Sequence, residues 1–82
     1  MWAPAKSIWR STLIEVKAEL VGNVWKIITK PGDAVIEDQP LLIIESMKME
    51  IEVVAPRAGV VVEIKVKETD NVIEGQVLVV LE

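Results

Sequence analysis

Apolar and polar residues alternate along one stretch in the second half of the chain. From residue 60 to residue 67, four apolar positions alternate with a mixed set: Val60, Val62, Ile64 and Val66 against Val61, Glu63, Lys65 and Lys67. A period of two is typical of a half-buried β-strand. The pattern therefore predicts a strand on which Val62 and Ile64 face the core.

A similar alternation occurs in the first half, where two sets are expected to face opposite ways: Trp25, Ile27 and Thr29 against Lys26, Ile28 and Lys30. Turn signals follow each stretch, at residues 31–33 (Pro-Gly-Asp) and 68–71 (Glu-Thr-Asp-Asn). The apolar runs that come next, 41–44 and 77–81, are too short and too rich in β-branched residues for helices. Because no window shows a helical stripe, the pattern predicts an all-β protein.

The chain contains an internal repeat. Residues 14–45 align with residues 51–82 at a constant offset of 37, without a gap, and 15 of the 32 aligned pairs are identical. The identical pairs include a glycine, a turn aspartate and several apolar residues, among them Gly22/Gly59, Asp33/Asp70, Val35/Val72, Ile36/Ile73 and Leu41/Leu78. The two halves are therefore predicted to share one topology of about four short strands each.

Neither half can bury its apolar face alone, so the halves should pack against each other with approximate twofold symmetry. The expected product is a small two-sheet sandwich or flattened barrel, since a solenoid needs about three repeats or more. Residues 46–50 join the halves. We expect them to form a tight hairpin at one end, with Lys48 at its exposed tip.

Composition narrows the possible functions. The chain has 82 residues and 51 % hydrophobic content, which fits one small domain, and it contains neither His nor Cys. Without these residues there is no Ser-His or Cys-His nucleophilic pair, no zinc site of the usual kind and no haem or iron-sulfur ligation. The net charge of −4 argues against nucleic-acid binding, which needs clustered Lys and Arg.

Residues 1–13 fall outside the repeat and are expected to form a poorly ordered leader. The alternative is a docking or organelle-targeting segment, because residues 1–12 carry Lys6 and Arg10 but no acid. They lack the apolar core of a signal peptide, which argues against secretion. No apolar run approaches the roughly 20 residues that span a bilayer. We expect a soluble protein of the cytoplasm, or of an organelle matrix, that binds no membrane.

Residues 45–50, Glu-Ser-Met-Lys-Met-Glu, resemble the attachment motif of biotinyl carrier domains, usually Glu-Ala-Met-Lys-Met. Met-Lys-Met alone is a weak signal, but its position between two gapless half-repeats makes it strong. Over residues 14–82 the chain is identified as a member of the biotin/lipoyl attachment family. That family folds as a barrel-sandwich hybrid of two four-stranded antiparallel sheets with pseudo-twofold symmetry. The resemblance implies one domain, 14–82, with half-repeats 14–45 and 51–82 and an attachment hairpin at 46–50.

By the same resemblance, Lys48 is the residue whose amine a biotin protein ligase would join to biotin, the implied covalent cofactor. Met47 and Met49 flank it as adaptable apolar side chains suited to recognition; the alternative is that they are ordinary hydrophobic cover. Lipoyl domains usually have Asp-Lys-Ala at this turn, so two methionines favour biotin over lipoate. Ser46 departs from the usual Ala. Gly22 and Gly59 match family glycines at turns.

The implied function is that of a biotin carboxyl carrier. Biotin on Lys48 would be carboxylated by a biotin carboxylase and would deliver the carboxyl group at a carboxyltransferase. Since the first half aligns with the second without an insertion, a protruding thumb loop is not expected. We expect a monomeric, non-catalytic domain with no metal site, whose acids Glu45, Glu50 and Glu52 form a solvated surface rather than an acid-base pair. A lipoyl carrier and an unmodified structural sandwich are the alternatives.

Overall fold

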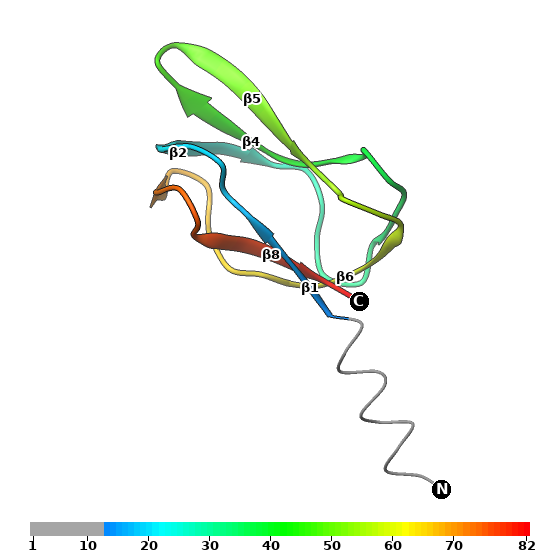
Figure 1. Ribbon diagram of the computed structural model, residues 1–82. Coiled ribbons are helices and arrows are strands. Elements are labelled where there is room, and N and C mark those ends of the chain that lie inside the picture. Colours follow the sequence, from blue (N-terminus) through cyan, green and yellow to red (C-terminus); the bar gives the residue numbers. More distant parts are fainter. Residues whose placement is uncertain (1–12) are drawn as a thin grey trace, which may run out of the picture.

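The computed structural model describes residues 13–82, and all its regular structure is β (Figure 1). The strands are β1 (Ile14–Lys17), β2 (Gly22–Ile27), β3 (Ala34–Val35), β4 (Pro40–Ser46), β5 (Met49–Val54), β6 (Gly59–Ile64), β7 (Asn71–Val72) and β8 (Val77–Leu81). The leader predicted over residues 1–13 lies, apart from Leu13, outside the described residues. Residues 13–82 contain no helix long and apolar enough to cross a lipid bilayer.

The strands form two four-stranded sheets, and each sheet takes strands from both repeats. One sheet has the order β1-β8-β6-β3 and the other β5-β4-β2-β7, with every pairing antiparallel. Exchanging the first repeat for the second (β1 for β5, β2 for β6, β3 for β7, β4 for β8) converts one order into the other. The predicted all-β sandwich with pseudo-twofold symmetry is therefore confirmed.

Hydrogen bonds that cross between the repeats obey the same symmetry. Asp38 N donates to Ala55 O at 2.8 Å, and at the equivalent place Gly75 N donates to Ala18 O at 2.8 Å. Asp38 and Gly75 both have positive φ, 69° and 88°. Aspartate and glycine tolerate this left-handed conformation better than most residues. The same turn therefore occurs once in each repeat and joins that repeat to the other by a backbone hydrogen bond.

The core lies between the sheets and is built from symmetry-related aliphatic residues, all 7 % exposed or less: Val16, Ala18, Val24, Val35, Leu41, Leu42, Ile44, Ala55, Val61, Val66, Val72, Leu78, Val79 and Leu81. Thr29 is the buried polar residue among those described, and its hydroxyl donates to the carbonyl of Leu41 at 3.2 Å. Its counterpart in the second repeat is Val66. The Thr29 hydroxyl therefore has a hydrogen-bond partner, although the equivalent position of the second repeat holds an apolar side chain.

The face predicted for residues 60–62 is wrong. Val61 is 1 % exposed, whereas Val60 and Val62 are both 42 % exposed. The register between β6 and β8 shifts between Val61 and Glu63. A bulge inserts one extra residue and so reverses which side chains point inward. Period two holds on either side of the bulge but not across it.

The same correction applies to β2. Val24 is fully buried, and Trp25, which was predicted to share a face with the buried Thr29, is 44 % exposed. Here the register with β4 shifts between Val24 and Lys26. The bulges stand at equivalent positions of the two repeats. They are a feature of the half-domain and not an irregularity of one strand.

Candidate functional site

The link between the repeats is a two-residue hairpin. Strands β4 and β5 pair as far as Ser46 opposite Met49, which leaves Met47 and Lys48 as the turn. Their φ angles are 52° and 65°, and two successive positive φ values characterise a type I′ turn. This turn twists in the sense that antiparallel strands require. Lys48 therefore stands at the tip of a short, regular hairpin, which Figure 1 shows at the end of the molecule away from the C terminus.

The turn places its side chains in solvent. Met47 is 92 % exposed and Met49 is 63 % exposed, and Lys48 is exposed between them. Within residues 13–82, no ion pair engages the Lys48 ammonium. Neither methionine covers the core, so the alternative of hydrophobic cover over the barrel end does not fit their exposure. The amine is open to a large partner.

The hairpin conformation is one that methionine and lysine seldom adopt. A residue with a Cβ that enters the left-handed region costs roughly 1–2 kcal/mol, and type I′ turns prefer Asn-Gly. The register from Ile44 opposite Ile51 to Ser46 opposite Met49 holds the two strands together up to the turn. Backbone strain persists only where the surrounding structure fixes the conformation, and it is common at functional sites that must hold a side chain in one position.

A loop from the first repeat supports the base of the hairpin. The hydroxyl of Ser46 donates to the carbonyl oxygen of Val21 at 2.8 Å. A Cβ added to Gly22 would lie 2.7 Å from the carbonyl oxygen of Glu45 and 2.5 Å from Cγ2 of Ile44. Gly22 begins β2 and is not a turn residue as predicted. It is required because the two backbones approach closely.

Gly59 has the same role at the opposite end of the sandwich. It begins β6, and a Cβ there would lie 2.7 Å from the carbonyl oxygen of Glu82. At both glycines the missing Cβ is therefore explained by the close approach of another backbone segment. Sequence reasoning missed the Ser46 to Val21 contact because the two residues are 25 positions apart.

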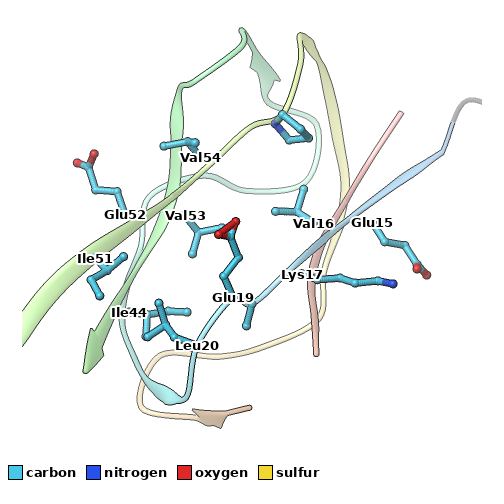
Figure 2. A pocket seen from close by; sticks show the side chains of 12 residues that line it. Glu15, Val16, Lys17, Glu19, Leu20, Ile44, Ile51, Glu52, Val53 and Val54 are labelled. Carbon is cyan, nitrogen blue, oxygen red and sulfur yellow. The ribbon is translucent and has the colours of Figure 1, made fainter. Parts of the chain in front are cut away.

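A groove runs between β1 and β5, the outer strands at one edge of each sheet (Figure 2). Val16 and Val53 lie between these strands, with Glu15, Lys17 and Glu52 at the rim. Val16 and Val53 are equivalent in the two repeats, so this groove lies on the pseudo-twofold axis. In residues 13–82, no cluster of three or more metal-ligating side chains occurs.

Comparison with known proteins agrees with this geometry. Residues 13–81 match the family model described as "Biotin-requiring enzyme". The chain is 50 % identical over 40 residues to a biotin/lipoyl attachment protein of Bacillus subtilis. This match covers 49 % of this chain and 55 % of that protein. It is 40 % identical over 52 residues to a biotin carboxyl carrier protein of Streptococcus mutans. This match covers 63 % of this chain and 40 % of that protein. The matched segments thus span about half the length of these relatives.

Solved structures similar to this chain include a carboxylase and a lipoyl domain. The urea carboxylase of Kluyveromyces lactis superposes with a TM-score of 0.82 at 33 % identity, covering 85 % of this chain and 6 % of that one. The lipoyl domain of the 2-oxoglutarate dehydrogenase complex of Azotobacter vinelandii superposes with a TM-score of 0.72 at 36 % identity, covering 84 % of this chain and 95 % of that one. With its two symmetric sheets and its exposed lysine hairpin, the chain belongs to the biotin/lipoyl attachment domain family, whose members are non-catalytic attachment domains.

Proposed function

We propose that Lys48 is the site of covalent biotin attachment and that the domain is a biotin carboxyl carrier. The observation that carries the proposal is the sequence Met47-Lys48-Met49 at the exposed tip of the hairpin at the midpoint of the duplicated fold. The relatives named as biotin carriers support the choice of biotin.

The residues present fit such an attachment. Acylation requires the neutral amine, and lysine amines are mostly protonated at neutral pH. A ligase must therefore activate the carboxyl group of biotin and hold the amine close to it. The Lys48 nitrogen would then attack the activated carboxyl carbon of biotin. The new amide bond replaces the bond between that carbon and the activating group, which leaves, and the amine loses a proton. An exposed amine on a turn fixed by the β4 and β5 ladder meets the positional requirement.

The two methionines supply contact surface on both sides of the amine. Their side chains are unbranched and adaptable, and their exposure, 92 % for Met47 and 63 % for Met49, is high for apolar residues without a partner. Contact with a ligase would remove this surface from water. We propose Met47 and Met49 as recognition residues on that ground.

When bound, biotin supplies a carboxyl group carried from a biotin carboxylase, which consumes ATP and bicarbonate, to a carboxyltransferase. The chain's own part is to hold the arm on a rigid, unreactive base. Tethering replaces diffusion with a high effective concentration at each active site. We propose these two enzymes and the ligase as partners, and the cytoplasm or an organelle matrix, where ATP is available, as the compartment.

The likeness to a lipoyl domain makes a lipoyl carrier the second candidate. Two experiments in parallel separate the candidates: incubation of the full chain with biotin protein ligase, biotin and ATP, or with a lipoate ligase, lipoate and ATP, each followed by intact-mass analysis. We expect the mass of one biotinyl group in the first reaction and none in Lys48→Arg. Lys65→Arg, which removes another exposed lysine, should still accept biotin. An unmodified wild-type chain in the first reaction contradicts the proposal, and lipoylation alone would establish the second candidate.

A further inference from the structure

A shallow hollow of about 640 Å³ lies beside the attachment hairpin. Its apolar lining includes Val21 from the loop before β2, Met47 from the turn and Ile73 after β7. These side chains are 64 %, 92 % and 64 % exposed. Exposed apolar side chains that gather around a concave site mark binding surfaces more often than scattered ones do.

We propose that this hollow is a resting site for the bicyclic ring of the biotin attached to Lys48. The inference rests on the proposed function and goes beyond it, because attachment by itself requires only an exposed amine. The ring is compact and apolar on its thioether side, and it carries an ureido group with two N–H donors and one carbonyl acceptor. A matching site needs an apolar floor and a few polar groups at its rim.

The pseudo-twofold symmetry shows what the fold itself requires at this position. The equivalent region at the other end of the sandwich keeps the isoleucine, since Ile73 corresponds to Ile36, which is 68 % exposed. Four other lining positions differ. At three of them the residue beside the attachment hairpin is larger or more polar: Val21 against Ala58, Asn23 against Val60, and Asn71 against Ala34; at the fourth, Leu20 gives an apolar lining where the far end has Arg57. The equivalent region of the other half-domain folds without these side chains, so the fold as such does not require them beside Lys48.

The two asparagines provide the polar rim. Asn23 Nδ2 donates to the carbonyl oxygen of Thr69 at 2.7 Å and to Asn71 Oδ1 at 3.1 Å. Both Asn23 donors are therefore engaged, which leaves its carboxamide oxygen to accept a bond and the Asn71 amide to donate one. An acceptor and a donor side by side complement the N–H and C=O groups of an ureido ring. The hydrogen bond between the asparagines also fixes their orientation.

The hollow is within reach of the tether. Ser46, two residues before Lys48, contacts Val21 directly through the 2.8 Å hydrogen bond, so one wall of the hollow adjoins the base of the hairpin. The lysine side chain and the valeryl chain of biotin form a flexible arm that can fold back over this distance. Short flexible tethers give effective concentrations in the mM range. A resting site of mM affinity would therefore be about half occupied, and a partner enzyme could still withdraw the ring.

The test compares methyl chemical shifts in the full chain, labelled at Val and Ile, before and after biotinylation by the ligase. A chain with Nε-acetyllysine at position 48 serves as reference, because it loses the same charge but has no ring. We expect the Val21 and Ile73 methyls to shift in the biotinylated chain relative to the acetylated one, while Ile36 stays unchanged. Ile36 is the matched control, since it has the same residue type and the same fold environment at the far end.

A pair of variants gives a second readout. Ile73→Ser should reduce the biotin-dependent shift of Val21 by half or more and raise the association rate of avidin with the attached biotin by up to about twofold, as expected when half the rings are docked. Ile36→Ser should change neither. Both isoleucines are largely exposed, so both variants should fold.

The outcomes separate the two proposals. A chain that carries biotin on Lys48 but shows no difference from the acetylated chain at Val21 and Ile73 overturns the resting site and leaves the proposed function standing. Equal effects of Ile73→Ser and Ile36→Ser would also overturn it. A chain that accepts no biotin overturns both proposals.

Discussion

The bulge in β6 can be tested with two neighbouring substitutions, Val61→Ala and Val62→Ala. Each removes the same two methyl groups and changes strand propensity equally, so the pair differs only in burial. Val61 is 1 % exposed and Val62 is 42 % exposed. Burial of a methyl-sized group is worth about 0.8 kcal/mol, and the cavity left behind adds to the loss. We expect Val61→Ala to lower the free energy of unfolding by about 2–3 kcal/mol and Val62→Ala to lower it by less than about 1 kcal/mol.

Such a loss is large for this chain. At 0.05–0.15 kcal/mol per residue, 82 residues have a total stability of about 4–12 kcal/mol. Urea unfolding followed by circular dichroism gives both free energies, and thermal unfolding should show a decrease in Tm of roughly 10–20 °C for Val61→Ala. If Val62→Ala costs more than Val61→Ala, the alternation continues unbroken through β6 and the bulge argument is refuted; equal costs would refute the difference in burial on which it rests.

Three further predictions concern backbone conformation. Thr69 has φ of 79° where the first repeat has Gly32. In a urea titration, Thr69→Gly should raise the free energy of unfolding by up to about 1 kcal/mol, because the relief of left-handed strain exceeds the entropy that glycine adds to the unfolded chain. Gly22→Ala should lower it by about 1–3 kcal/mol, because the new Cβ meets the Glu45 carbonyl at 2.7 Å; a neutral result would show that the strands can separate. Met47→Asn should raise stability by up to about 1 kcal/mol, because asparagine tolerates positive φ, yet slow biotinylation in a mass-spectrometric time course. Equal rates would show that Met47 is not read by the ligase.

The proposed attachment site could be predicted from the sequence because its signal is local. Met47, Lys48 and Met49 are consecutive, and they lie at the midpoint of a gapless repeat. Symmetry then requires the link to be short and to stand at one end of the sandwich. The type I′ geometry was not predicted, since neither Met nor Lys is a residue that this turn prefers. It follows from the pairing of β4 with β5, which fixes the strands up to the turn.

The resting site proposed for biotin could not have been found in the same way. Val21, Met47 and Ile73 come from three separate segments, and no pattern of spacing connects them. Their exposure is visible only once the sheets are assembled. What the repeat does offer is a comparison within one chain, because the lining residues outside the link, such as Val21 and Ile73, each have a counterpart at the far end of the sandwich.

The sequence by itself determined the all-β class, the duplication, the two equivalent sets of turns and the residue at the tip of the link. These depend on periodicity, turn chemistry and self-similarity, which are properties of neighbouring residues or of a constant offset. Only the tertiary structure decided which valines of β6 point inward and why Gly22 and Gly59 are needed. Both depend on where a second strand lies: a bulge is defined by the partner strand opposite it, and a Cβ is excluded by a backbone from another part of the chain.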